Sequence, residues 1–494
     1  MCDRERGWSE VPLVKSWQLI AGAAVAGLAL SVAAVAAAGP WDSGQRKAER
    51  DRAASWGLAG GADHGGGPGS GLLPQAAPSA PGVLGAIGPG AARGQAAAPA
   101  ASGKLAAALK PLLADPALGT VRTASVVDTA TGEVLYESGA RDAMTPASTV
   151  KIVTAAAALA ALGPEHRIRT TVVPGAAPGQ IVLVGGGDPS LTAKKKSPAG
   201  SGGSLVALAA DTAQALKAAG TDTVTLGYDD SLYTGPARHP IGVNPNIAPV
   251  TALTADEGRP DDSTSGPVDR TEDPSKDAAR AFRTLLTERG IKVTGEPART
   301  KPGAGGAAPA QPLATTLSTP VAGLVERMLT NSDNDIAEAL ARQTALASGQ
   351  PASFEGAEKA VAAKLAALGV DTAGSRFADG SGLNRADKVS AGLLTGLLTK
   401  AADPQRPELR PVLTGLPVAG FTGTLRGRNA GTSPAAGLLR AKTGTLTGVN
   451  SLSGTVVDSS GRLLAFAFLT ANGPGPEGAE KALDKLAAAV AASS

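Results

Sequence analysis

The stretch PASTVKIVTAAAAL, residues 146–159, places a serine and a lysine three residues apart. At this spacing Ser148 and Lys151 fall on one face of a helical turn. A serine hydroxyl is a weak nucleophile until a base removes its proton, and a lysine is such a base only if its pKa falls from about 10.4 toward neutrality. Burial lowers the pKa of a lysine, and the alanine-rich run after Lys151 predicts apolar surroundings. The pattern indicates either a serine nucleophile with a lysine base or an ordinary surface lysine.

A second candidate lies in LTNSDNDIAEAL, where Ser332, Asp333 and Asn334 fall between two helical patterns. A hydroxyl and an amide held on a short loop can relay a proton to a leaving amine and bind a substrate amide. Serine, aspartate and asparagine are also the residues preferred as helix N-caps. A simple helix cap is therefore the alternative to a catalytic role.

The third candidate is a group of neighbours within LLRAKTGTLTGVNSLSGTVVD, namely Lys442, Thr443, Gly444 and Thr445. This stretch and the later run RLLAFAFLT predict adjacent antiparallel strands. A glycine after Lys-Thr lets a substrate backbone pair with the strand edge. We expect Lys442 to add positive charge that lowers the pKa of Lys151, and the threonine hydroxyls to bind a terminal carboxylate. The alternative is an ordinary hairpin edge with a solvated lysine.

The composition limits the other kinds of site. The chain has one cysteine, Cys2, which excludes an intrachain disulfide and a cysteine-rich zinc site. It has three histidines, so a Ser-His-Asp site has few candidates and a different base is favoured. A net charge of +3 over 494 residues and 3% aromatic residues argue against a nucleic-acid-binding protein.

The N-terminal 40 residues resemble an export signal. Residues 19–38 are free of charge and about long enough to span a bilayer, and they follow Arg4, Arg6 and Lys15. The small residues before Gly39 suit cleavage, whereas the length and the polar lead suit an uncleaved anchor; a buried alanine-rich helix is the remaining alternative. We predict a signal peptide or signal-anchor over residues 1–40, and an exported protein that meets the membrane only through this segment.

The rest of the chain divides into a linker and two folded parts. Residues 41–103 are dominated by Gly, Ala, Pro and Ser, which predicts a flexible linker. Beyond it, RTASVVDTATGEVLYES predicts a hairpin before the Ser148 helix, and helical and strand patterns alternate from His166 to Leu317. We predict one domain over residues 104–165 and 318–494, interrupted by an inserted domain over residues 166–317.

The three motifs occur once each, in the order Ser-x-x-Lys, Ser-x-Asn, Lys-Thr-Gly, on a helix, an inter-helix loop and a strand. In this the chain resembles the penicillin-recognising serine enzymes. More narrowly it resembles the type-4 penicillin-binding proteins, D-alanyl-D-alanine carboxypeptidases that also act as endopeptidases. The narrower resemblance rests on the stretches GGGDPSLT, YDDSLYTGP, DGSGLNRAD and FTGTLRGR.

The resemblance implies an α/β (α+β) fold. Its main part is a serine β-lactamase/transpeptidase-like domain with an antiparallel sheet flanked by helices, interrupted by an inserted mixed α/β domain. It also implies that Ser148 is the acylated nucleophile and Lys151 its base, while Ser332 relays a proton and Asn334 binds the substrate amide.

The remaining site residues follow from the same resemblance, in which Lys442, Thr443, Gly444 and Thr445 form the substrate-binding strand. The backbone amides of Ser148 and Thr445 would form the oxyanion hole. Residues 379–384 would shape the site without a chemical role. No metal or cofactor is implied; the substrates are peptidoglycan stem peptides, and β-lactams are inhibitors.

Two other functions stay open. A β-lactamase uses the same acylation, but the chain has no convincing Glu-x-x-x-Asn loop and carries Ser-x-Asn where class C enzymes have Tyr-x-Asn. A non-catalytic wall-binding protein with the same fold would be expected to have lost at least one of the motif residues.

Overall fold

The computed structural model describes residues 99–196, 202–302 and 311–494. The predicted signal segment and most of the predicted linker therefore lie outside the described residues. Helix α3 (Pro99–Leu113) begins inside the linker predicted over residues 41–103, so the linker prediction extended too far. Proline is favoured in a first helical turn, which suits a start at Pro99. No helix in the described part of the chain is both long enough and apolar enough to cross a membrane.

The first sheet joins the two ends of the described chain. It has five antiparallel strands in the order β2-β1-β10-β9-β8, with bounds β1 (Val121–Asp128), β2 (Val134–Ser138), β8 (Leu439–Leu446), β9 (Val449–Val457) and β10 (Leu463–Ala471). The predicted hairpin is confirmed as β1 and β2, and the predicted neighbouring strands after Lys442 are β8, β9 and β10. Strand β8 lies at the edge of the sheet.

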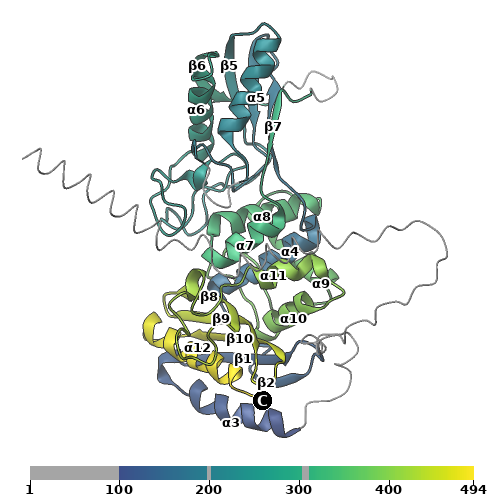
Figure 1. Ribbon diagram of the computed structural model, residues 1–494, viewed down its shortest axis with the longest axis vertical. Helices are drawn as coiled ribbons and strands as arrows, with labels where there is room; N and C mark the ends of the chain where they lie inside the picture. Colours follow the sequence, from purple (N-terminus) through teal and green to yellow (C-terminus); the bar gives the residue numbers. More distant parts are fainter. Residues whose placement is uncertain (1–98, 197–201, 303–310) are drawn as a thin grey trace, which may run out of the picture. The chain divides into compact units, whose positions relative to one another are not determined.

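Helices cover both faces of this sheet (Figure 1). On one face, α3 and α12 (Pro476–Ala491) pack against Phe466 and Phe468 of the central strand β10. On the other face, the small side chains of Ala465 and Ala467 contact a helical layer. Its members are α4 (Lys151–Leu162), α7 (Val321–Asn331), α8 (Asn334–Ala347), α9 (Phe354–Ala367), α10 (Ala391–Ala402) and α11 (Arg410–Thr414). A strand buried on both faces is expected to be largely apolar, and β10 is apolar except for Thr470, whose hydroxyl donates to the Asn450 carbonyl oxygen.

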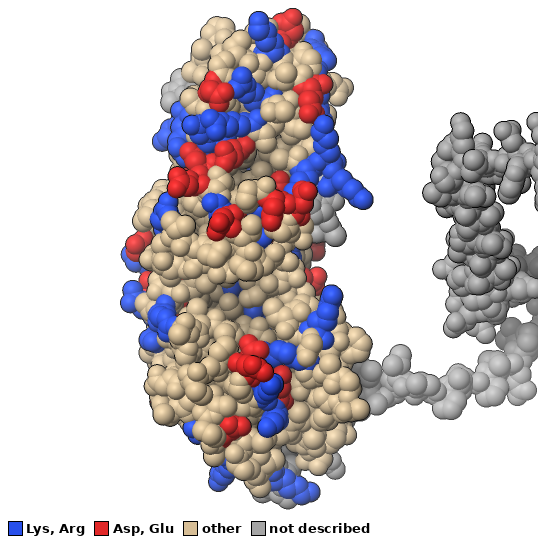
Figure 2. All heavy atoms as spheres, turned by 90° about the vertical axis from the view of Figure 1, so that its left-hand side faces the viewer, with Lys and Arg blue, Asp and Glu red and all other residues tan. Residues whose placement is uncertain are grey.

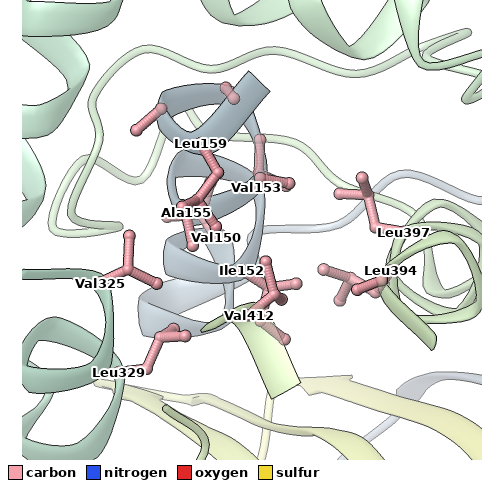
Figure 3. Close-up of a cluster of buried hydrophobic side chains, with 14 of the residues drawn as sticks. Val150, Ile152, Val153, Ala155, Leu159, Val325, Leu329, Leu394, Leu397 and Val412 are labelled. Carbon is pink, nitrogen blue, oxygen red and sulfur yellow. The ribbon is translucent and has the colours of Figure 1, made fainter. Parts of the chain in front are cut away.

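Helix α4 lies in the middle of this helical layer. Figure 3 shows its Ile152, Ala155 and Leu159 facing side chains of α7, α10 and α11. The first nine residues of α4 are all buried. A helix that is apolar all round is a core helix, and a lysine at its first position is therefore withdrawn from water.

Residues between α4 and α7 build a second sheet. Its strand order is β6-β5-β4-β3-β7, with bounds β3 (Arg169–Pro174), β4 (Gln180–Val184), β5 (Thr223–Asp229), β6 (Lys292–Arg299) and β7 (Ala314–Leu317). Strands β4, β5 and β6 pair in parallel, whereas β3 pairs antiparallel with β4 and β7. Helices α5 (Leu205–Ala218) and α6 (Pro274–Thr287) share a separate apolar core with this sheet. The predicted fold class, an antiparallel sheet with flanking helices and a mixed α/β insertion, is confirmed.

Short 3₁₀ turns complete the chain at η2 (Pro116–Leu118), η3 (Ala147–Val150), η4 (Asp256–Gly258), η5 (Pro407–Leu409) and η6 (Gly423–Leu425). On the face drawn in Figure 2, basic and acidic side chains are intermixed. We refer below to residues 166–317 as the inserted segment.

Candidate active site

The first motif lies where a tight turn runs into α4. Ser148 belongs to the 3₁₀ turn η3, and Lys151 is the first residue of α4. Residues three apart eclipse one another in a 3₁₀ turn, so the two side chains point the same way. Lys151 Nζ donates a hydrogen bond to Ser148 Oγ at 3.1 Å. The sequence predicted a helical turn at Ser148, and in the structure this turn is a 3₁₀ turn that leads into α4.

The Lys151 ammonium is enclosed by oxygen atoms. The side chain is fully buried, and Nζ also donates to Asn334 Oδ1 and to the Ser381 carbonyl oxygen, both at 2.6 Å. These three acceptors match the three donors of an ammonium group. Burial lowers the pKa of Lys151 to about 8, although nearby carboxylates, led by Asp379 and Glu338, act in the opposite direction. A useful fraction of this lysine is therefore neutral in mildly alkaline solution.

The second motif joins α7 to α8. Ser332 ends α7 in the left-handed conformation, with φ +59°, and Asp333 caps α8 by accepting the Ile336 amide at 3.0 Å. The capping alternative is thus correct for Asp333. The flanking side chains of Ser332 and Asn334 instead face the lysines of the other two motifs.

Lys442 of β8 is the second buried lysine of the site. Its Nζ donates to Ser332 Oγ at 2.9 Å and to the Thr443 carbonyl oxygen at 2.8 Å. Burial and then the charge of Lys151 hold the pKa of Lys442 well below its usual range. The sequence predicted that Lys442 lowers the pKa of Lys151. Burial is the largest cause that lowers the pKa of Lys151, and the effect of Lys442 on Lys151 stays a prediction.

Strand β8 passes directly beside the Ser148 turn. A Cβ atom on Gly444 would lie 2.2 Å from Ser451 Oγ and 2.8 Å from the Pro146 carbonyl oxygen, so only glycine allows this approach. Thr443 donates to the Thr424 hydroxyl at 3.1 Å, and Thr445 is exposed. The structure therefore brings all eight predicted site residues to one place.

A cavity of about 480 Å³ opens at the Ser148 hydroxyl. Motif residues on its wall are Ser148, Ser332, Asn334 and Thr445. The inserted segment contributes Asn246, Arg259 and Arg270 to the same wall. Asn334 Nδ2 donates to the Asn246 carbonyl oxygen at 3.0 Å. The cavity can thus hold a peptide against Ser148 between the two folded parts.

Comparison with known proteins decides the family. The sequence model of the D-Ala-D-Ala carboxypeptidase 3 (S13) family matches residues 105–266 and 260–492 of this chain. The chain belongs to this S13 family. The predicted resemblance to type-4 penicillin-binding proteins is thereby confirmed, as are a peptidase activity and a D-Ala-D-Ala carboxypeptidase function.

Relatives of the S13 chain cover most of it. It is 39% identical to carboxypeptidase DacB of Mycolicibacterium smegmatis, over 78% of this chain and 83% of that protein. It is 31% identical to the D-alanyl-D-alanine carboxypeptidase of Actinomadura sp. (strain R39), over 74% and 80%. The crystal structure of penicillin binding protein 4 (dacB) from Haemophilus influenzae shares the fold, with a TM-score of 0.63 at 22% identity over 78% of this chain and 97% of that one.

Asn246 and His239 were not predicted as site residues of this S13 chain, and Ser381 was expected only to shape the site, without a chemical role. The Ser381 carbonyl oxygen contacts Lys151, and the Asn246 carbonyl oxygen orients Asn334. His239 forms a hydrogen bond with Asp379, in the loop that carries Ser381. The only sequence signal was the glycine-rich stretch DGSGLN, which predicts a tight turn and no particular partner.

Proposed function

We propose that Ser148 is the nucleophile and Lys151 the base with which this S13 carboxypeptidase cleaves peptidoglycan stem peptides ending in D-Ala-D-Ala. The observation that carries the proposal is the 3.1 Å contact between Lys151 Nζ and Ser148 Oγ, in a site that lowers the pKa of the lysine to about 8. A base is most effective when its pKa lies near the working pH.

The first half of the reaction is acylation. Neutral Lys151 takes the proton of Ser148, and Oγ attacks the carbonyl carbon of the penultimate D-alanine. The backbone amides of Ser148 and Thr445 hold the developing oxyanion. The carbon–nitrogen bond breaks, and Lys151 passes the proton that it took from Ser148 through Ser332 to the departing amine of the terminal D-alanine, which leaves Lys151 neutral again. Lys442 contacts Ser332 at 2.9 Å.

The second half is hydrolysis of the ester. A water molecule gives a proton to Lys151 and attacks the same carbonyl carbon, the bond to Ser148 Oγ breaks, and the serine regains its proton. The product is a stem peptide one D-alanine shorter. The balance needs only water as co-reactant.

Substrate binding is proposed for the rest of the motif residues. Strand β8 has a neighbour, β9, on one side only along the Lys-Thr-Gly stretch, which supports pairing with an extended peptide. Asn334 would bind the substrate amide. The carboxylate of the terminal D-alanine would meet Lys442, Thr443 and Thr445, with Gly444 giving the peptide room to approach.

Several wider features belong to the same proposal. β-Lactams would acylate Ser148 as inhibitors, which is supported by the Haemophilus influenzae fold relative, whose crystal structure has also been determined in complex with a β-lactam. Endopeptidase cleavage would use the same serine. The N-terminal segment would export the protein and either leave it free or anchor it outside the membrane. Residues 104–165 and 318–494 would form the catalytic domain around the inserted domain 166–317.

Intact mass after incubation with a β-lactam tests the proposal. The wild-type protein should gain one drug mass, the Ser148→Ala variant none, and only the wild type should release D-alanine from a D-Ala-D-Ala peptide. Rapid drug turnover without an adduct would point to a β-lactamase. A folded wild type that forms no adduct and releases no D-alanine would point to a non-catalytic wall-binding protein.

A further inference from the structure

The loop of residues 379–384, DGSGLN, touches both reactive groups of the site; we call it the Asp379 loop. Its Ser381 carbonyl oxygen accepts from Lys151 Nζ at 2.6 Å and lies 3.5 Å from the Ser148 hydroxyl. Its Gly380 carbonyl oxygen accepts from the Thr154 hydroxyl, one turn along α4, at 2.6 Å. A displacement of this loop would therefore move the Ser381 carbonyl oxygen away from Lys151 Nζ.

The loop is folded around one buried carboxylate. Asp379 Oδ1 accepts the amides of Ser381 at 3.0 Å and Gly382 at 2.6 Å, and Oδ2 accepts the Asn384 amide at 2.7 Å. Asp379 is 5% exposed. Its position sets the course of the whole turn, because three backbone amides of the turn donate to it.

Helix α8 holds the Asp379 loop through one side chain, Glu338. Glu338 Oε1 accepts the amides of Gly380 and Ser381, at 3.0 and 2.9 Å. Glu338 follows Asn334 by four residues, so one face of α8 presents the amide to Lys151 and the carboxylate to the loop. The loop and the second motif are thus held by the same helix.

The inserted segment reaches this network through one histidine. His239, in the connection between β5 and α6, is 3% exposed, and its Nε2 lies 2.9 Å from Asp379 Oδ2. Its Nδ1 accepts the Ile241 amide at 3.2 Å, so in the neutral ring the proton is on Nε2, which donates to Asp379. The ring of Phe354 packs edge-on against the imidazole, with centroids 5.3 Å apart.

The same hydrogen bonds argue against a metal site at His239, Glu338 and Asp379. His239, Glu338 and Asp379 lie close enough together to hold a metal ion. The Nε2 that is protonated in this arrangement has no free lone pair for a metal, and Asp379 Oδ2 already accepts from it. The geometry points to a hydrogen-bonded support.

We propose that His239 is a positioning residue, supplied by the inserted segment, that holds Asp379 and through it keeps the Ser381 carbonyl oxygen against Lys151. The proposal rests on the proposed function, because its readout is acylation of Ser148. It gives the inserted segment a part in catalysis separate from any contact with substrate.

The titratable groups around Lys151 determine how the acylation rate should depend on pH. They are the carboxyl groups of Asp379, Glu338, Asp333 and Asp387 and, on β8, the ammonium group of Lys442. Burial and the neighbouring charge of Asp379 raise the pKa of Asp387 to about 10, so Asp387 is neutral. Burial opposes ionisation of Asp379, but the hydrogen bonds from His239, Asp387 and the Gly382 amide together outweigh it and hold the pKa at about 2.

Displacement of the Asp379 loop should therefore change the pKa of Lys151. The anionic Asp379 and the Ser381 carbonyl both favour the ammonium form of Lys151. If the loop moves away, the pKa of Lys151 falls and the acid limb of the acylation rate shifts to lower pH. The plateau rate falls as well, because the lysine is no longer aligned with Ser148.

The test compares His239→Leu with His239→Gln by measuring the acylation rate constant for a chromogenic penicillin from pH 6 to 10. Leucine removes the donor, whereas the glutamine amide can place an N–H where Nε2 lies. We expect the leucine variant to lose between about 10-fold and 100-fold at the plateau and to shift its acid limb downward, and the glutamine variant to stay within about threefold of wild type. His166→Leu, an exposed histidine of the same segment, is the matched control.

Each outcome decides for or against the positioning role. A folded leucine variant with the wild-type plateau and acid limb would overturn it, and so would equal losses in the leucine and glutamine variants. If the leucine variant does not fold, Asp379→Asn replaces it, and an unchanged acid limb in that variant overturns the proposal. Absence of acylation in the wild type itself would instead refute the proposed function.

Discussion

The side-chain amide of Asn334 donates to the main-chain oxygen of Asn246 at 3.0 Å, which joins the second motif to the inserted segment at the wall of the cavity. An amide has one donating and one accepting end, so this bond also fixes which end faces the lysine. Asn334 Oδ1 accepts from Lys151 Nζ at 2.6 Å. The inserted segment therefore selects the orientation in which Asn334 stabilises the protonated lysine.

An Asn334→Asp variant should test this orientation. The new carboxylate cannot donate to Asn246 and places a negative charge against Lys151, which raises the pKa of the lysine by about 1–3 units. We expect the acid limb of acylation to move above pH 8 by that amount and the rate at pH 7 to fall accordingly. Gln405→Glu makes the same chemical change at an exposed position and serves as the control. An acid limb at the wild-type position would contradict the contact.

The wild-type enzyme should acylate faster as the pH rises toward about 8. The neutral form of Lys151 is the base, and its fraction grows about tenfold per pH unit below the lowered pKa before it levels off. Stopped-flow acylation by a penicillin from pH 6 to 10 measures this directly. A plateau already reached at pH 6 would show that neutral Lys151 is not the base.

Lys151→Met should separate activity from stability. We expect acylation to fall by at least about 100-fold, because a general base contributes about that much or more. The protein should still fold, but its midpoint of thermal unfolding should fall, because Asn334 Oδ1 and the Ser381 carbonyl oxygen lose their buried donor. A Lys151→Met variant that still acylates would argue against Lys151 as the base. A variant that fails to fold would argue against a role confined to catalysis.

Lys442→Met should weaken recognition of the substrate carboxylate. A charge-assisted hydrogen bond contributes about 1.5–3 kcal/mol, so kcat/KM for a D-Ala-D-Ala peptide should drop by about 10-fold to 150-fold. Arg440→Met removes an exposed cation from the same strand and controls for net charge. Equal kcat/KM values for the two variants would rule out a specific role for Lys442.

Two glycine substitutions should have opposite effects on stability. Gly444→Ala would force a Cβ atom to within 2.8 Å of the Pro146 carbonyl oxygen, beside the Ser148 turn, and overpacking of this kind costs about 1–3 kcal/mol in the free energy of unfolding. Gly396→Ala, within α10, meets open space and should stabilise the protein by about 0.5–1 kcal/mol. Denaturant unfolding measures both, and acylation should slow only in the Gly444 variant. A Gly444→Ala variant as stable and active as wild type would contradict the close approach of β8 to the Ser148 turn.

The motif residues could be predicted from sequence because their defining relationships are local. Ser148 and Lys151 meet because they stand three positions apart in a helical turn, and the strands around Lys442 form neighbouring hairpins. The alternation of helix and strand patterns likewise separates the inserted segment, since each element is specified by its own few residues.

Only the tertiary structure decided which of these residues act as partners. Lys442 contacts Ser332, and two of the oxygens that enclose Lys151 come from Asn334 and Ser381, far away in the sequence. His239 and Asp379 stand 140 positions apart, yet they form one buried hydrogen bond. Such contacts depend on how whole elements pack, and a side chain's own neighbours in the sequence carry no information about that packing.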